Sequence, residues 1–374
     1  DRVQLRRRNF IRPQQMPYTN PMGQTYDTGR FEHVLDQALP LADWAGFDAR
    51  AAQSRARGLW RGLGIATFLE WTGGNAFEER VTVDVQAGGV IEVYSAVNQM
   101  GQGIATSLAQ LVVDAFDVPI EQVRVVLGDT DRGNGFGTAG SRSLFTGGSA
   151  MLTGARRTVD EARKLAATEL EVSEADIRYE AARFTVAGTD RGIDLFALAG
   201  KQAGGHIYVE HTHTVAGPTW PNGAHVSEVE IDPQTGTVVV VAYTGVNDIG
   251  RVVNPTIVRG QLVGGAVQGI GQALMERLVY DGETGQLLTG SLMDYCAPRA
   301  QDFACDFHME MDESTPCANN LLGVKGVGEL GTIGATPCVV NAIADALARN
   351  GRADAAPKLQ MPLSAARLWS LLHA

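Results

Sequence analysis

The stretch VTVDVQAGGV (Val81–Val90) recurs later in the chain as VEIDPQTGTV (Val229–Val238). Both copies fit V-x-[V/I]-D-x-Q-x-G-x-V, in which alternating apolar residues predict a strand and the glycine predicts a turn into a second strand. Each copy is followed by a predicted helix start of the form Q-G-I-x-x-x-L, at Gln102 and at Gln268. Two linked matches in the same order indicate an internal repeat. We therefore predict an α+β fold made of tandem related α+β subdomains.

The spacing of apolar residues in the rest of the sequence allows the whole chain to be divided into segments. Hairpins interleaved with helices favour an α+β architecture over a long βαβ series. We expect a connecting segment at 1–60, a first subdomain at 61–205 and a second at 206–374. Apolar spacing predicts helices at 103–116, 143–169, 257–277, 335–349 and 362–373, and strands at 62–70, 80–86, 90–97, 123–128, 206–215, 225–232 and 237–246.

Composition limits the kinds of partner that this chain can have. The 374 residues are 44% hydrophobic and carry a formal net charge of -11, which disfavours extended contact with nucleic acid or anionic membranes. No apolar run in the sequence is long enough to suggest a membrane span. The four cysteines show no C-x-x-C spacing, which favours reduced thiols in the cytoplasm over zinc or iron–sulfur ligation. We expect small-molecule and protein partners.

The stretch GFGTAG (Gly135–Gly140) fits the G-x-G-x-x-G pattern of dinucleotide-binding loops. The context argues against NAD or FAD, because the preceding predicted strand ends near Gly128 and Asp160 falls inside the next helix. The overlapping GTAGSRS can still bind an anion through backbone N–H groups, a helix start and the guanidinium of Arg142. A glycine-rich turn without a ligand explains the same residues equally well.

Three further glycine-dense stretches favour the ligand-binding interpretation. They are NQMGQGIA from Asn98, GGAVQGIGQ from Gly264 and GVKGVGELGTIG from Gly323. Four such stretches would be an unusual way to build a core, but they could surround one large polyanionic ligand with backbone N–H donors. His211 and His213 share a predicted strand face that could hold a metal, although a plain polar face is the commoner explanation.

The motifs taken together resemble a known family. They are MGQG (100–103), GTAGSRS (137–143), NDIGRVVNP (247–255), GGAVQGIGQALMER (264–277) and GVKGVGELG (323–331). In this order they resemble the C-terminal half of the molybdenum-binding large subunit of the xanthine oxidase and aldehyde oxidoreductase family of molybdenum hydroxylases. The resemblance covers nearly the whole chain. The family's N-terminal half, which supplies part of the substrate pocket, is then expected from the same gene or from a separate chain.

The resemblance implies a molybdopterin cytosine dinucleotide whose dithiolene, rather than any protein residue, holds the molybdenum. It implies Glu329 as the catalytic base and places Gln268 near the metal. A helix N-terminus and Lys325 would favour the charged form of Glu329, although an acid at a helix start also has a purely structural explanation. The implied cofactor-binding residues are Gly101, Gln102, Gly103, Thr138, Ala139, Gly140, Ser141, Arg142, Gln268 and Gly328.

The activity implied is oxidation of an aldehyde or N-heterocycle with oxygen derived from water. Electrons would leave through iron–sulfur clusters and FAD on partner subunits, since no cysteine set here could ligate a cluster. A carbon monoxide dehydrogenase or an aryl-CoA reductase is the alternative within the family. A nicotinamide-dependent dehydrogenase and a non-enzymatic binding module are the alternatives from other classes.

Overall fold

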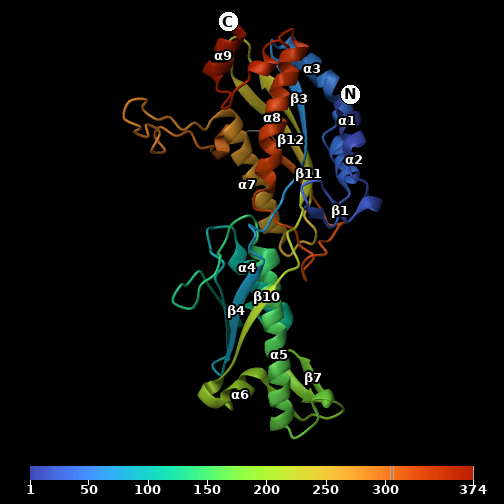
Figure 1. Ribbon diagram of the computed structural model, residues 1–374, viewed down its shortest axis with the longest axis vertical. Coiled ribbons are helices and arrows are strands. Elements are labelled where there is room, and N and C mark those ends of the chain that lie inside the picture. Colours follow the sequence, from blue (N-terminus) through green and yellow to red (C-terminus); the bar gives the residue numbers. More distant parts are fainter. Residues whose placement is uncertain (304, 306, 374) are drawn as a thin grey trace.

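The two copies of the sequence repeat form the central hairpins of two separate four-stranded sheets. The computed structural model describes residues 1–303, 305 and 307–373, and it stacks the sheets in two lobes along the long axis of the molecule (Figure 1). Both chain termini lie in the same lobe (Figure 1). The mixed sheets and helices confirm the predicted α+β class.

The first lobe contains a sheet covered by two helices, α4 (Ile104–Phe116) and α5 (Ser149–Glu169). A π-helical turn at Ser143–Gly148 leads into α5, so the predicted helix at 143–169 has two parts. The sheet order is β10 (His206–Thr214), β4 (Glu78–Gln86), β5 (Val90–Ser95) and β6 (Val123–Leu127). A small distal sheet that we did not predict contains β7 (Ile177–Glu180), β8 (Arg183–Val186) and β9 (Gly192–Asp194), followed by α6 (Leu195–Gly200).

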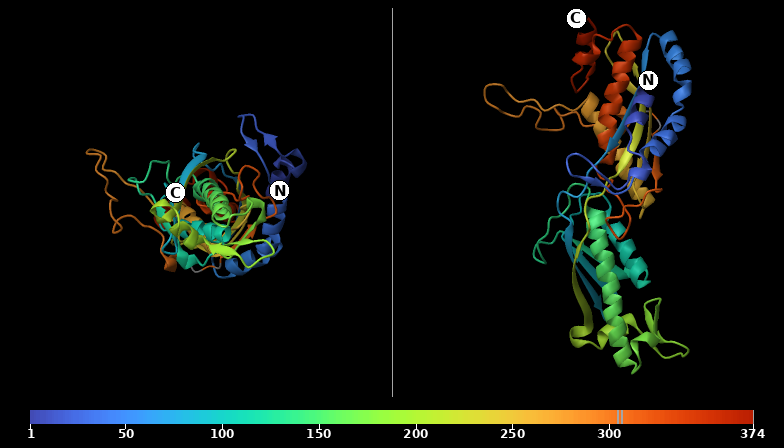
Figure 2. Two further views of the ribbon diagram at one scale, coloured as in Figure 1. Left: turned by 90° about the horizontal axis from the view of Figure 1, so that it is seen from below. Right: turned by 45° about the vertical axis from the view of Figure 1, so that its right-hand side comes forward.

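The second lobe has helices on both faces of its sheet, as Figures 1 and 2 show. Both faces of β11 are therefore covered, and all ten of its residues are buried. The sheet order is β3 (Trp60–Leu69), β11 (Asn222–Ile231), β12 (Val238–Asp248) and β13 (Phe307–Asp312). The helices are α7 (Pro255–Leu274) and α8 (Leu330–Arg349) on one face, and α2 (Phe31–Leu41) and α3 (Phe47–Ala56) on the other; α1 (Arg2–Asn9) and α9 (Ala365–His373) lie near the chain ends.

The two lobes exchange one strand each. β3 comes just before the first hairpin in sequence but pairs with β11 of the second sheet, with Ile65 opposite Val226. β10 comes just before the second hairpin but pairs with β4 of the first sheet, with Val209 opposite Val83. The lobes therefore do not separate at residue 205, where we expected a boundary. Apolar alternation specifies which face of a strand is buried, but not which sheet the strand joins.

The exchange brings two connecting segments together at the waist between the lobes. After β3 and after β10 the chain passes from one lobe to the other, and the two passages are hydrogen-bonded. Glu70 N–H donates to Pro221 O at 2.9 Å and Thr72 N–H donates to Thr219 O at 3.2 Å. The waist is therefore a double connection rather than a single linker.

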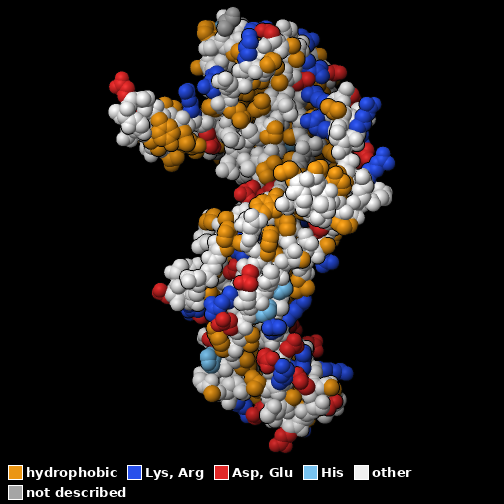
Figure 3. Space-filling model, in the orientation of Figure 1, with side chains coloured by type: hydrophobic (Ala, Val, Ile, Leu, Met, Phe, Trp, Pro, Cys, Tyr) orange, Lys and Arg blue, Asp and Glu red, His pale blue; other side chains and the backbone are white. Residues whose placement is uncertain are grey.

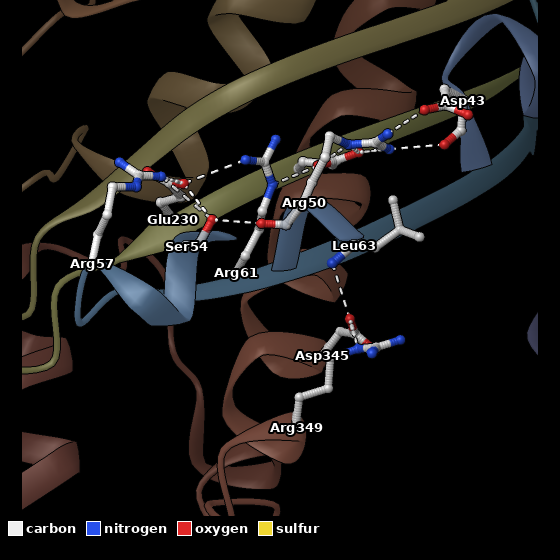
Figure 4. Close-up of polar contacts among 10 residues, drawn as sticks. Asp43, Arg50, Ser54, Arg57, Arg61, Leu63, Glu230, Asp345 and Arg349 are labelled. Atoms are coloured by element: carbon white, nitrogen blue, oxygen red, sulfur yellow. Dashed lines mark hydrogen bonds and ion pairs between the residues drawn. The ribbon is translucent and has the colours of Figure 1, made fainter. Parts of the chain in front are cut away.

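The first 60 residues are an integral part of the second lobe, which differs from the connecting segment we expected. Figure 4 shows Arg57 and Arg61 facing Glu230 of β11. Arg50 Nη2 and Arg61 Nε lie 2.6 Å from opposite oxygens of the buried Glu228 carboxylate. Arg57 pairs with the neighbouring Glu230 (Figure 4). These ion pairs and an apolar cluster attach α2 and α3 to the sheet.

An arm at residues 275–300 projects from the second lobe between α7 and β13 (Figures 2 and 3). It is held by an isolated β-bridge between Tyr280 and Leu287. Its exposed apolar side chains include Leu292 and Met293. In Figure 3 apolar side chains also gather on this arm.

Helix α8 begins at Leu330, five residues earlier than predicted, so Glu329 stands at its N-cap. We expected no apolar run long enough to span a membrane, but this helix is long and apolar enough by length and composition. However, 56% of its apolar window is buried in the molecule. Its buried face packs on β3 and α7. We therefore interpret α8 as a core helix.

Close packing of β3 on α8 depends on glycine. A Cβ added to Gly64 would lie 1.9 Å from Cys338 O, a backbone atom that cannot move aside alone. We expect Gly64→Ala to lower the free energy of unfolding by at least the ~1–3 kcal/mol typical of an overpacked core. Gly260→Ala on α7 is the control, since its Cβ meets no atom within 4 Å and alanine favours a helix by about 0.5–1 kcal/mol. Urea unfolding of both variants checks this; equal stabilities would contradict the packing argument.

Candidate functional site

A cavity of about 280 Å³ lies at the waist, where both lobes contribute its wall. The first lobe contributes the loop before α4 and the loop before the π-helical turn. The second lobe contributes the start of α7 and the loop before α8. The lining residues are Met100, Gln102, Ile104, Ser107, Thr138, Ala139, Gly140, Ser141, Ser143, Leu144, Asn254, Ile257, Val258, Gln261, Lys325, Gly326, Val327, Gly328 and Glu329.

The two glycine-rich loops of the first lobe are joined to each other. Asn98 N–H donates to Thr138 Oγ1 at 2.9 Å, and Thr138 N–H donates to Asn98 Oδ1 at 3.1 Å. Gln102 closes its own loop, because its amide donates to Asn98 O at 2.7 Å and accepts from Met100 N–H at 2.7 Å. Gly101 and Gly103 flank it at φ +89° and +77°, conformations that favour glycine. These hydrogen bonds join the two loops into one wall of the cavity.

This wall presents unpaired backbone donors. The N–H groups of Ala139, Gly140 and Ser141 reach no acceptor in the part of the chain that the structure describes. Gly140 and Ser141 are both left-handed, at φ +55° and +56°. The N-cap residues of α4 and α8, Gly103 and Glu329, make no capping hydrogen bond with their own side chains, although Ala105 N–H in the first turn of α4 donates to Gln99 Oε1 at 3.3 Å. Free N–H groups and positive helix ends together form an anion-binding surface.

Glu329 lies at the cavity beside Ser141. Its Oε2 accepts a hydrogen bond from Ser141 Oγ at 2.6 Å, and its own N–H lies 3.3 Å from the same Oγ. Gly328 allows this approach, because a Cβ there would lie 3.2 Å from Ser141 Oγ. The carboxylate is exposed and held at one oxygen, which suits a proton acceptor.

A second carboxyl group, Glu70, lies on the other side of Ser141. Glu70 is only 5% exposed; its Oε1 lies 3.2 Å from Ser141 Oγ, and its Oε2 has no hydrogen-bond partner within the described residues. Burial, and after it the nearby charge of Glu329, raise the pKa of Glu70 to about 8. Sequence analysis missed Glu70. The available signal was an acidic residue directly after the apolar strand GIATFL.

The structure gathers most of the predicted site residues around one cavity. Gln102, Glu329, Gly328 and residues 138–141 line it, and Gly101 and Gly103 adjoin it. Gln268 does not line the cavity: it is exposed further along α7, and Gln261 lines the cavity instead. The stretch from Gly264 is the interior of α7 rather than a loop. Gly265 and Gly269 serve helix packing, since an added Cβ would lie 3.1 Å from Gly331 Cα and 2.8 Å from Ala335 Cβ, respectively.

The prediction that the guanidinium of Arg142 contacts the ligand needs correction. Arg142 is fully buried, and Nη1 and Nη2 both lie 3.0 Å from Glu79 Oε2. Its remaining donors bond to the carbonyl oxygens of Ala76, Gly137 and Glu78. A guanidinium has five N–H donors, and all five are used inside the protein. Arg142 therefore supports the loop from within.

Lys325 is also occupied elsewhere. Its ammonium lies 2.7 Å from Asp248 Oδ2, and both side chains are fully buried. We expected Lys325 to favour the charged form of Glu329. The ammonium of Lys325 instead forms a buried ion pair with Asp248. Among the described residues, no group of three His, Cys, Asp or Glu side chains is arranged to hold a metal, and His211 Nδ1 instead lies 3.2 Å from Arg157.

Comparison with known proteins identifies what this chain is similar to. A family model described as the molybdopterin cofactor-binding domain matches residues 37–304. The nicotine 6-hydroxylase large subunit of Paenarthrobacter nicotinovorans is 36% identical over 93% of this chain and 45% of its own length. The carbon monoxide dehydrogenase large chain of Hydrogenophaga pseudoflava is 33% identical over 100% of this chain and 48% of its own.

A solved structure shows the same similarity in three dimensions. Quinoline 2-oxidoreductase from Pseudomonas putida 86 superposes with a TM-score of 0.86 at 31% identity, covering 99% of this chain and 49% of that one. The chain thus spans about half the length of the relatives it matches.

Proposed function

Because the chain belongs to the molybdenum-binding large subunits of the xanthine oxidase family, we propose that the waist cavity holds a molybdopterin cytosine dinucleotide in a molybdenum hydroxylase. The unpaired N–H groups of residues 139–141 are the observation that carries the proposal. They suit the phosphates of a dinucleotide, and they need no guanidinium. Gln102, Thr138 and Gly328 line the same cavity.

The residues of this chain divide the work of the proposed reaction. When bound, the cofactor supplies a molybdenum centre that takes two electrons from the substrate and introduces oxygen derived from water. Glu329 accepts a proton at the cavity, and Ser141 holds its carboxylate in place. The glycine-rich loops orient the cofactor, and the protein's main contribution is positioning.

An N-heterocycle or an aldehyde is the proposed substrate class. Two of the relatives bear names that refer to oxidation of N-heterocycles, nicotine and quinoline. A carbon monoxide dehydrogenase is the second candidate, since one relative bears that name, and an aryl-CoA reductase is a further alternative in the family. The residues that select the substrate would come largely from the other half of the subunit.

The proposed assembly needs further polypeptide. The N-terminal half of the large subunit, on the same gene or a separate chain, would close the cavity. Iron–sulfur and FAD subunits would carry the electrons away, consistent with relatives named as a large subunit or a large chain. We propose a cytoplasmic location for this complex.

Analysis of the bound cofactor tests the proposal. We expect the natively purified complex to contain molybdenum and to release CMP on acid hydrolysis, in equal amounts. We also expect this chain alone to be inactive with aldehydes or heterocycles and a dye acceptor. Bound nicotinamide without molybdenum would instead support a dehydrogenase, and a complex without any cofactor would support a binding module.

A further inference from the structure

Three side chains form a row across the waist, each from a different segment. Glu70 follows β3, Ser141 belongs to the glycine-rich loop, and Glu329 precedes α8. Ser141 Oγ lies 3.2 Å from Glu70 Oε1 and 2.6 Å from Glu329 Oε2. The hydroxyl therefore lies between two carboxyl groups.

The number of available protons restricts this row. A serine hydroxyl has one hydrogen and two acceptor lone pairs. The shorter contact assigns that hydrogen to Glu329, and the Glu329 N–H at 3.3 Å can occupy one lone pair. With that hydrogen on Glu329, the 3.2 Å contact between Ser141 Oγ and Glu70 Oε1 is favourable when Glu70 carries a proton and donates it to the remaining lone pair. A direct hydrogen bond to Glu329 also favours the protonated form of Glu70 and helps to raise its pKa. With that proton, every atom of the hydroxyl is satisfied.

We propose that Glu70 is a positioning residue that keeps a proton and donates it to Ser141 Oγ, so that Ser141 in turn donates to Glu329 and keeps Glu329 ready to accept a proton. The role in positioning follows from this chain's geometry. Its effect on turnover rests on the proposed function.

The surroundings of Glu70 support the neutral form. The charged groups on the adjoining segments are Glu329 and two closed ion pairs, Arg142 with Glu79 and Lys325 with Asp248. The charge that shifts the pKa of Glu70 is the anion Glu329, no cation of the described residues contributes to that shift, and Glu70 Oε2 is buried without a hydrogen-bond partner. The pKa of Glu70 is accordingly raised to about 8, first by burial and then by Glu329.

This arrangement predicts a pH dependence. Below about pH 8 Glu70 is neutral and the row is complete. Above that pH Glu70 becomes an anion that competes for the Ser141 hydrogen and adds negative charge beside Glu329. The orientation of Glu329, and with it the rate, should then fall. The stability effect has the same sign. The contribution of Glu70 to folding stability is fully present below its pKa in the unfolded chain, and it is lost as the pH rises through its raised pKa in the folded protein.

The test uses Glu70→Gln in the complete, cofactor-loaded complex. Gln imitates the neutral acid, because its amide can donate to Ser141 Oγ but cannot ionise. We expect single-turnover rates within a few-fold of wild type at pH 7 and no alkaline fall near pH 8. Infrared spectra give a readout independent of activity: the wild type should show a protonated carboxylic acid that ionises near pH 8, and this signal should be absent from Glu70→Gln.

Glu210→Gln is the matched control, since Glu210 is an exposed acid on β10 paired with Arg80; it should change neither readout. An infrared signal unchanged in Glu70→Gln would overturn the proposal. So would a large rate loss at every pH, because it would mean that Glu70 acts as an anion. If the complex contained no molybdenum, the proposed function would fail, but the infrared result would still decide the proton on Glu70.

Discussion

Replacement of Glu329 by Gln is expected to slow single-turnover reduction of the loaded enzyme by about 10²- to 10⁴-fold, the usual contribution of a positioned base. Glutamine keeps the size of the side chain and an oxygen that can accept the Ser141 hydrogen bond, which measures 2.6 Å in the wild type. The fold and the cofactor content should therefore survive. Only the capacity to accept a proton is lost.

Rapid-mixing reduction by substrate measures this effect without interference from slower electron transfer to partners. Molybdenum content must be measured on the same sample, because an empty site would imitate the loss. Glu121→Gln, at an exposed position before β6, serves as the control and should react at the wild-type rate. If the fully loaded Glu329→Gln enzyme reacts within a few-fold of the wild-type rate, Glu329 is not the base, and its role is the structural one of an acidic residue at the start of α8.

Replacement of Arg142 by Ala is expected to destabilise the protein by about 3–5 kcal/mol, the usual cost of removing one partner of a buried ion pair. The variant leaves the Glu79 carboxylate buried without its guanidinium, and it also leaves three carbonyl oxygens without their donors. We expect little soluble protein and a large fall in the unfolding midpoint. Molybdenum content should fall only because the loop unfolds.

The comparison variant is Arg80→Ala, which removes an exposed ion pair with Glu210. It should cost about 0–1 kcal/mol, because surface pairs are screened by solvent. Thermal unfolding of both variants in the complex checks the difference. A stable, well-folded Arg142→Ala protein that lacks only its cofactor would show that the guanidinium binds ligand, as the glycine-loop pattern first suggested.

Local sequence patterns determined much of the secondary structure. The alternation of Val81, Val83 and Val85 predicted β4, and these side chains are fully buried on one face of it. The repeated motif correctly indicated two related hairpins, β4–β5 and β11–β12, each followed by a helix. The motifs around Gln102, Thr138 and Glu329 identified most of the cavity wall. These signals are short-range, so they can be read directly from neighbouring residues.

Tertiary structure alone decided which distant residues meet. The apolar pattern of β3 predicted a strand, but it did not predict that this strand pairs with β11. A strand's pattern specifies which face is buried and not which strand lies beside it. Arg142 is a cationic residue in a glycine-rich loop, so the sequence suggested that it binds an anion. In the folded chain its guanidinium is bonded to Glu79 and to three carbonyl groups instead. Glu70 carried no motif and acquired its raised pKa only when the waist buried it beside Ser141 and Glu329. The sequence by itself indicated the two repeated hairpins, most of the helices and most of the loops at the cavity, but not the small distal sheet. Burial and long-range pairing determined which charged side chains form internal ion pairs, as Arg142 and Lys325 do, and which remain at the cavity, as Glu329 does.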